Sequence, residues 1–420
     1  MIDTINVYLW GRKVGTLASS PDNNNVCFYY DAAYVKDGYE IAPLVAPLGG
    51  VKAQRGLPFY PEKDKLFDGL PSFIADSLPD HWGNTVFNEW AKRNNIHVRN
   101  LSPIDRLAYI GKRGMGALEF LPSIAGEMES PFKVVIAELY NLSLEALDDA
   151  KGFGASMSSD ILIESLFKVG TSAGGKRPKA IINVDWQTKR CYSGQVPSPE
   201  PDFVPMIIKF DEHCDMPTTR IEYSYYLMAK DAGMNMTGCY LLEGNCQTHF
   251  LTERFDRNGN DKIHIQTLAA MNPDADSYED LMEVAFRIGL SSTEKRQLFM
   301  QMVMNVVCGN VDDHTKNFSF LMSVDGVWHA APAYDFTFTV DPNGWQMFNK
   351  HSITVCNKTE HIQTADMMEI AKRYNIKSAS SIIDSVKTVA ANYRKYGEQS
   401  GVNDKWITII EKEISSRISE

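Results

Sequence analysis

Hydrophobic positions alternate with polar ones in the first part of the chain. The runs at residues 5–10 and 26–30 alternate in this way and are separated by turns rich in Gly, Asn and Asp, a pattern typical of half-buried strands. Strand-like runs return at residues 180–184, 203–210 and 248–257. The sequence therefore predicts a strand-rich first part.

Helical periodicity predominates after about residue 268. Before that point, helices are predicted at 82–94, as two or three stretches within 130–168, and at 223–232. After it, the predicted helices are 278–288, 293–308, 364–374, 378–396 and 404–418. Strands followed by helices predict an α+β fold with a strand-rich N-terminal part and a mostly helical C-terminal part. We expect three domains, at residues 1–125, 126–257 and 258–420.

A polar turn follows the apolar stretch Leu298–Cys308. Its six positions Asp312-Asp313-His314-Thr315-Lys316-Asn317 hold two acids, a His, a Lys and an Asn between segments fit for burial. Charged side chains held in a turn on a buried scaffold usually have a functional role. A third acid, Asp335, follows in an apolar, strand-like context.

The order of Asp312, Asn317 and Asp335 is the order of the catalytic and metal-binding residues of protein kinases. There the first Asp orients and deprotonates the acceptor hydroxyl, and the Asn and the second Asp hold magnesium on the ATP phosphates. Magnesium prefers hard oxygen ligands, which both residues supply. The D-x-x-x-x-N spacing also occurs by chance in surface loops, so the kinase interpretation depends on further elements in the right order.

Three such elements precede the turn. Residues 169–179 form a Gly-rich loop with the cations Lys176, Arg177 and Lys179, fit to attract phosphate but equally open to a solvated hairpin. Lys209 ends a hydrophobic strand, where kinases carry the Lys that meets the phosphates and where an edge lysine can also reach water. Residues 248–257, a strand that enters the connection 258–261, then match the hinge between kinase lobes.

Two other features have simpler explanations beside the functional ones. Glu222 is a candidate partner of Lys209, but a first-turn Glu is also explained by the helix dipole. The turn Gly111-Lys112-Arg113-Gly114-Met115-Gly116 lacks the strand-to-helix setting of a phosphate-binding loop, so we expect a structural connection.

Composition narrows the class of protein. The chain has 420 residues, 44% of them hydrophobic and 23% charged, which is typical of a globular protein with a sizeable core. Its net charge of −11 argues against a broad nucleic-acid-binding face. Seven Cys without a C-x-x-C pair argue against a disulfide framework or structural zinc site. With neither a secretory leader nor a membrane-spanning apolar run in the sequence, we expect a cytoplasmic protein without a membrane partner.

The chain resembles the HipA-type serine/threonine kinases, the toxins of bacterial toxin–antitoxin pairs, over nearly its full length. The motifs that carry the resemblance are Gly69-Leu70-Pro71 to Asp80, Arg106 to Glu119, Glu253-Arg254-Phe255-Asp256-Arg257, Asp312 to Ser319, and Ala333-Tyr334-Asp335. The resemblance implies a two-lobed protein-kinase-like fold with an extra N-terminal subdomain, and ATP and Mg²⁺ as cofactors.

The resemblance also implies residue roles. Asp312 would be the catalytic base, and Asn317 and Asp335 would hold magnesium. ATP would be bound by Gly174, Gly175, Lys176, Arg177, Lys179, Lys209, Glu253, Arg254, Phe255, Asp256, His314, Lys316 and Tyr334. Autophosphorylation of Ser172 would switch the kinase off, and because the loop departs from the family form Gly-Ala-Gln-x-Lys, Thr171 is the alternative site.

The function implied is phosphorylation of a translation-related protein, such as an aminoacyl-tRNA synthetase, with growth arrest and persistence as the outcome. The implied partner is a HipB-like DNA-binding antitoxin, so nucleic acid is contacted only indirectly. Two alternatives stay open: a small-molecule or lipid kinase of the same fold, and a non-catalytic co-repressor with a relic ATP site. Phe336-Thr337 replaces the Phe-Gly of ordinary kinases, so their Phe-flip switch is not expected.

Overall fold

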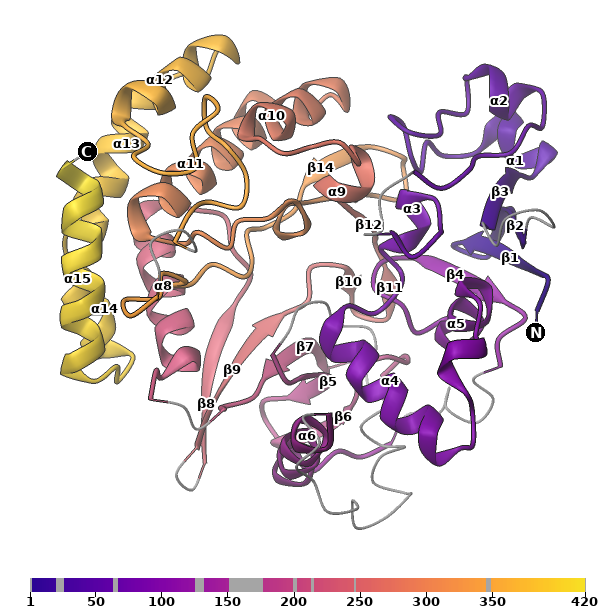
Figure 1. Cartoon of the computed structure of the whole chain (residues 1–420), viewed down its shortest axis with the longest axis horizontal. Coiled ribbons are helices and arrows are strands. Elements are labelled where there is room, and N and C mark those ends of the chain that lie inside the picture. The colour runs from indigo at the N-terminus through magenta and orange to yellow at the C-terminus, as the bar shows by residue number, and fades with distance from the viewer. Residues whose placement is uncertain are drawn as a thin grey trace. The chain divides into compact units, whose positions relative to one another are not determined.

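The computed structural model describes residues 2–19, 26–62, 67–124, 132–150, 177–198, 202–212, 215–244, 247–344 and 349–419, with residues 93 and 145–150 as backbone only. The chain divides into two compact units. Unit 1 comprises Met1–Glu212, Leu251–Gln266 and Met322–Gly326, and unit 2 comprises His213–Phe250, Thr267–Leu321 and Val327–Glu420. Figure 1 labels their elements in chain order. The three-domain division stays a prediction.

Unit 1 contains an antiparallel sheet of β1 (Thr4–Leu9), β2 (Arg12–Ser19), β3 (Val26–Tyr30) and β4 (Leu118–Leu121), in the order β3-β2-β1-β4. The alternation predicted for β1 is present, because Ile5, Val7 and Leu9 are buried and the residues between them are not. Helix α5 (Pro103–Ile110), which begins with a capping box at Ser102, packs against β1, β2 and β4. The short helices of this region are α1 (Ala32–Asp37), α2 (Val51–Gln54), α3 (Ser72–Ala75) and η2 (Val98–Asn100).

A second sheet in unit 1 is built on β5 (Lys179–Asp185), flanked by β6 (Arg190–Ser193) and β7 (Val204–Lys209). Strands β5 and β7 are antiparallel, and Lys179 lies directly opposite Lys209. Helix α4 (His81–Arg93) is joined to this sheet, since the buried indole of Trp82 donates a hydrogen bond to the Lys179 carbonyl at 2.8 Å. Helix α6 (Ile136–Ala150) packs against α4. Unit 1 also contains the end of β9 (Gln247–Glu253), the strands β10 (Arg257–Asn258) and β11 (Asp261–Lys262), and most of β12 (His264–Thr267).

Unit 2 is organised around α11 (Ser292–Cys308). Every residue from Leu298 to Cys308 is buried, because α10, α13 and α15 pack around this helix. A capping box of Ser291 and Glu294 begins α11, and Gly309, in the left-handed conformation at φ 69°, ends it. The other elements are α8 (Thr218–Ala232), β8 (Cys239–Gly244), α9 (Leu268–Met271), α10 (Tyr278–Arg287), η4 (Thr315–Asn317), β13 (Ser319–Met322), β14 (Trp328–Ala330), α12 (Thr364–Arg373), α13 (Ala379–Ala390), α14 (Tyr393–Gln399) and α15 (Asp404–Ser419).

Most predicted helices are confirmed within a residue or two, but two are not. The single helix predicted at 378–396 is wrong: the chain bends at residues 391–392 between α13 and α14. Tertiary contacts favour this break, because Tyr393 bonds the Ser224 hydroxyl and Tyr396 donates to Asp231, both on α8. The helix predicted from Tyr223 begins five residues earlier, at Thr218. No helix in the part of the chain that the structure describes has the length and apolarity needed to cross a bilayer.

Candidate active site

The loop between α11 and β13 presents one exposed carboxylate on a tightly bonded backbone. Asp312 is exposed, whereas Val311 and Asp313 on either side of it are buried. The backbone N–H groups of Val311 and Asp312 both donate to the Thr339 hydroxyl, at 2.7 and 3.1 Å. The Asn317 side-chain nitrogen donates to the Asp312 carbonyl at 2.7 Å. Both ends of the loop are thus held while the Asp312 side chain faces solvent, as a catalytic base requires.

Asn317 is oriented by the same bond. Because its amide nitrogen is directed at Asp312, the planar amide turns its oxygen to the opposite side, where an oxygen ligand for a cation can act. Asn317 is itself 9% exposed. Among the residues described, no group of three or more His, Cys, Asp or Glu side chains could hold a metal ion by itself. The oxygens of Asn317 and Asp335 would be a small donor set of the kind that fits Mg²⁺, which is usually bound by one or two protein oxygens together with substrate phosphates.

Asp335 has an unusual backbone conformation. Its φ is 51°, in the left-handed region that non-glycine residues rarely adopt. The following residues anchor it, since Phe336 is buried with its ring 5.1 Å from that of Tyr225. Such strain persists only where the surroundings impose it, and it concentrates at functional sites. The conformation makes Asp335 a candidate functional residue, and its metal-binding role stays a prediction.

Asp313 is the buried anchor of the loop. Its carboxylate, fully removed from solvent, accepts hydrogen bonds from the Tyr278 hydroxyl at 2.6 Å, His351 Nδ1 at 2.7 Å and the Ser352 backbone N–H at 2.8 Å. The guanidinium of Arg417, which can only donate, lies 3.4 Å from His351 Nε2. This arrangement fits the histidine tautomer that carries its proton on Nδ1.

The Asp313 network continues into α11. The Asn305 side chain donates to the Tyr278 hydroxyl and accepts from the Asn310 side chain, each at 2.9 Å. Burial and the neighbouring Asp313 charge raise the pKa of Tyr278 far above its usual value, so its hydroxyl stays a donor. A chain of polar contacts therefore links the main helix of unit 2 to the backbone that carries Asp312.

The other predicted site residues of unit 2 lie on or beside the same loop. His314 is exposed and precedes η4. The Tyr334 hydroxyl donates to the Lys316 carbonyl and lies 2.6 Å from the Ser319 hydroxyl, which places Tyr334 against the loop. Glu222 is buried and lies in the second turn of α8, because the helix begins at Thr218, so the explanation as a first-turn Glu is wrong. Its pairing with Lys209 stays a prediction.

In unit 1, two predicted phosphate-binding lysines are neighbours. Lys179 and Lys209 are a cross-strand pair, so their side chains project from the same face of the sheet. Two cations on one face favour a polyanion. Arg177 lies 3.5 Å from Glu212 in a half-buried ion pair. The predicted residues Thr171, Ser172, Gly174, Gly175 and Lys176, and the helices expected after residue 150, lie outside the described residues.

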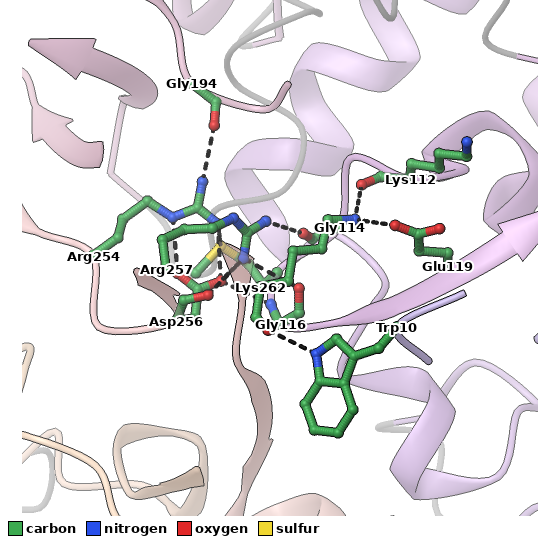
Figure 2. A network of polar contacts seen from close by, with 11 residues as sticks. Trp10, Lys112, Gly114, Gly116, Glu119, Gly194, Arg254, Asp256, Arg257 and Lys262 are labelled. Atoms are coloured by element: carbon green, nitrogen blue, oxygen red, sulfur yellow. Dashed lines mark hydrogen bonds and ion pairs between the residues drawn. The ribbon is translucent and has the colours of Figure 1, made fainter. Parts of the chain in front are cut away.

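The predicted hinge contains a buried ion cluster (Figure 2). Arg254 grips Asp256 with two hydrogen bonds of 2.8 Å, and Arg257 donates to the same carboxylate at 2.7 Å. The Gly116 N–H donates to Asp256, while the Gly114 and Gly116 carbonyls accept from Arg257. Residues 111–116 are therefore a structural connection, as predicted.

The cluster gives the side chains of Arg254 and Asp256 a structural role, since both are buried. Burial opposes the ionisation of Asp256, but the charges of Arg254 and Arg257 outweigh it and hold its pKa well below the usual value. Glu253 and Phe255 are half-buried. Nucleotide contacts by these four residues stay a prediction.

Sequence reasoning missed the residues that support the loop. Asp313, Tyr278, His351 and Thr339 carry the network, and only Asp313 stood inside a recognised motif. Its partners are separated from it by 35 to 39 positions. The one available signal was a second acid beside the exposed Asp312.

Comparison with solved structures identifies the class of fold. The toxin HipA of Shewanella oneidensis MR-1, in a complex with HipB and operator DNA, is similar over 99% of this chain and 96% of that chain, with a TM-score of 0.66 and 15% identity. The kinase CtkA of Helicobacter pylori matches 51% of this chain and 87% of its own at 13% identity, with a TM-score of only 0.35. The predicted α+β, kinase-like fold is confirmed.

Family models then match most of the chain. The HipA N-terminal domain matches residues 5–121, and the HipA-like C-terminal domain matches residues 171–393. The chain belongs to the HipA family, and the resemblance to HipA-type toxins found in the sequence is confirmed.

Proposed function

We propose that this chain is an ATP- and Mg²⁺-dependent serine/threonine protein kinase that acts as the toxin of a cytoplasmic toxin–antitoxin pair. The observation that carries the proposal is the exposed Asp312, set between buried residues and bonded through its backbone to Thr339 and Asn317. A carboxylate carried on a backbone bonded in this way can orient a substrate hydroxyl, because positioning and electrostatics supply most of the catalysis in phosphoryl transfer.

The protein groups have distinct roles in this proposal. Asp312 accepts the proton of the substrate hydroxyl, and the oxygens of Asn317 and Asp335 hold Mg²⁺, which neutralises phosphate charge when bound. Lys209, with Lys179 on the same sheet face, attracts the phosphates. The ATP contacts predicted for residues 174–177, 253–256, 314, 316 and 334, and autophosphorylation at Ser172 or Thr171, belong to the same proposal.

We further propose a HipB-like antitoxin as the partner. The Shewanella HipA was solved with HipB and operator DNA, and the present chain matches nearly all of that protein. With a formal net charge of −11, this chain is suited to reach DNA through such a partner rather than by a broad surface of its own. The protein substrate would be a translation-related protein.

The largest effect on catalysis is expected from Asp312→Asn. Removal of the proton acceptor should lower phosphotransfer by about 100-fold or more while leaving the fold intact. The full-length protein is incubated with γ-labelled ATP, Mg²⁺ and host lysate, and label is followed in protein, small molecules and lipids. Mass spectrometry of the purified protein locates autophosphorylation.

Asp274→Asn is the matched control, because Asp274 is also an exposed aspartate of unit 2. It should retain full activity. Full transfer by a folded Asp312→Asn protein would falsify the assigned role, and label that enters only small molecules or lipids would identify a different kinase. If ATP and Mg²⁺ leave the melting temperature of the wild-type protein unchanged, the nucleotide site itself is refuted.

A further inference from the structure

The last helix of unit 2, α15, places an arginine where α11 ends and the Asp312 loop (residues 309–318) begins. Helix α15, at the C-terminal end of the chain (Figure 1), packs against α11. The side chain of Arg417, in the last turn of α15, is only 17% exposed. Its guanidinium donates to the Val306 carbonyl at 3.3 Å, and a Cβ atom on Gly309 would lie 3.5 Å from its Nε. Arg417 therefore contacts the chain directly before the Asp312 loop.

The charge and the donors of Arg417 suit this position. The C-terminal end of a helix has unpaired carbonyls and a partial negative charge, which a cation stabilises. In a continued helix the Asn310 N–H would pair with the Val306 carbonyl, but it bonds the Asn305 carbonyl instead. Arg417 supplies the missing donor. The Glu413 carboxylate, one turn earlier on α15, accepts from Arg417 Nε at 2.7 Å and so fixes the guanidinium from its own helix.

Arg417 also contacts the histidine of the Asp313 network. Its Nη1 lies 3.4 Å from His351 Nε2. A guanidinium can only donate, so this contact is a hydrogen bond when Nε2 offers its lone pair and the ring carries its proton on Nδ1. That proton is then directed at the Asp313 carboxylate, 2.7 Å away. Arg417 therefore favours the tautomer of His351 that bonds Asp313, and it holds the ring from the opposite side.

His351 belongs to a segment that bonds both neighbours of Asp312. The Ser352 N–H donates to the Asp313 carboxylate at 2.8 Å, and the Ser352 hydroxyl donates to the Val311 carbonyl at 3.1 Å. Val311 and Asp313 stand on either side of Asp312 in the chain. A displaced His351 ring would thus disturb the bonds that hold the backbone on both sides of the exposed carboxylate.

The helix that supplies Arg417 lies outside the span matched by the family model. The HipA-like C-terminal domain matches residues 171–393, whereas α15 begins at Asp404. Asp312, Asp313 and His351 all lie within the matched span. A residue beyond that span therefore contacts the network that supports the loop within it.

We propose that Arg417 is a positioning residue for phosphotransfer, which acts on Asp312 through His351 and Asp313. This inference rests on the proposed function. In it, Arg417 touches neither the substrate nor the metal. A catalytic group that is misplaced by about 1 Å can lose about 100-fold in rate. Because nucleotide binding does not depend on this contact, the expected effect of losing Arg417 is a lower kcat with little change in KM for ATP.

The test compares Arg417→Met with Arg394→Met in the full-length protein. Methionine keeps an unbranched apolar side chain but cannot donate, so Arg417→Met should lower kcat about tenfold and leave KM for ATP within about twofold. Arg394 is the matched control, because its ion pairs are with Glu398, Asp404 and Glu411 on α14 and α15. Arg394→Met should keep kcat within about twofold. An equal loss of kcat in both variants would overturn the proposal.

A double-mutant cycle tests the route through His351. In a protein that already carries His351→Gln, the further change Arg417→Met should lower kcat less than about twofold, because the group through which it acts is gone. Effects that multiply would show that Arg417 acts independently of His351. That result would overturn the proposal, as would a His351→Gln protein with the kcat of the wild type.

Two measurements do not depend on phosphotransfer. Hydrogen exchange of residues 310–318 and 351–354 should become about tenfold faster in Arg417→Met but not in Arg394→Met, and unchanged exchange would overturn the proposal. In the wild-type protein labelled with ¹⁵N-histidine, the NMR signal that is absent from His351→Gln should show a proton on Nδ1 alone, and a proton on Nε2 would refute the contact with Arg417.

The outcomes separate this inference from the proposed function. If the wild-type protein transfers phosphate while Arg417→Met matches it in kcat, the positioning role alone fails. If the wild-type protein transfers no phosphate, the proposed function fails, and with it a role in phosphotransfer. The ¹⁵N measurement needs no variant of Arg417, so it remains decisive if Arg417→Met fails to fold.

Discussion

Asp256 in unit 1 and Asp313 in unit 2 are both fully enclosed aspartates, but different kinds of group compensate the burial of their carboxylates. Asp256 is bonded by two arginines and one backbone N–H, whereas Asp313 is bonded by a tyrosine, a histidine and a backbone N–H. The first is a cluster of full charges that joins chain segments within unit 1. The second surrounds one charge with donors that are neutral or titratable, directly beneath the exposed Asp312.

The two arrangements respond differently to the loss of one member. A charge cluster is rigid but depends on every member, because loss of one leaves buried charges without compensation. Hydrogen bonds from neutral groups cost less when one is lost, yet they fix direction closely. The segments around Asp256 are thus joined by charge, whereas the loop above Asp313 is oriented by the geometry of its hydrogen bonds.

The largest effect on stability is expected from Asp256→Asn. It leaves Arg254 and Arg257 buried without their carboxylate, which should cost about 3–5 kcal/mol. Hydrogen exchange measured by mass spectrometry reports the free energy of opening for the segments around residues 111–121 and 254–264. Asp261→Asn, an exposed change on the neighbouring hairpin, should stay within about 0.5 kcal/mol. Equal exchange in both variants would refute the charge cluster as the source of cohesion.

A pH titration should separate Asp256 from another buried group of unit 1. Burial lowers the pKa of His264 from 6.5 to about 4, so folded His264 stays neutral while the unfolded chain takes up a proton below pH 6.5. Stability is therefore complete above pH 6.5 and is lost as the pH falls toward 4, by about 3 kcal/mol in total. The lowered pKa of Asp256 keeps that residue ionised throughout this window.

The measurement is the exchange of the same unit 1 segments between pH 7 and pH 4, corrected for intrinsic exchange rates. His264→Gln should remove most of the slope, because glutamine does not titrate there. A variant that keeps the full slope would assign the acid sensitivity to other groups.

The smallest effect on stability, but a marked one on catalysis, is expected from Asp313→Asn. The amide keeps the shape but mismatches one of three donors, which should cost about 1–3 kcal/mol. A displaced loop should lower kcat about 10- to 100-fold with little change in KM for ATP. Steady-state kinetics beside Asp274→Asn test this, and an unchanged kcat would show that the network does not position Asp312.

Much of this architecture can be predicted from the sequence. The surroundings of Asp256 and those of Asp313 differ in this respect. The helix Leu298–Cys308, the strand ending at Lys209 and the polar turn at Asp312 are local patterns, and periodicity and spacing predict them. The arginines around Asp256 stand two residues before and one after it, inside a recognised motif.

The partners of Asp313 cannot be predicted from local sequence patterns. His351 and Tyr278 come from a later loop and an earlier helix, and only folding brings them to one carboxylate. The bend at residues 391–392 was missed for the same reason, since contacts with α8 rather than local propensity produce it.

The bond from the Trp82 indole to the Lys179 carbonyl has a consequence for how the gene can be divided. Residue 82 lies within the span matched by the N-terminal family model and residue 179 within that of the C-terminal one, yet both belong to unit 1. Gly116 and Asp256 are joined across the same two spans. A cut between the two spans would divide one folded unit. Both spans should therefore stay on one chain when the protein is expressed and purified.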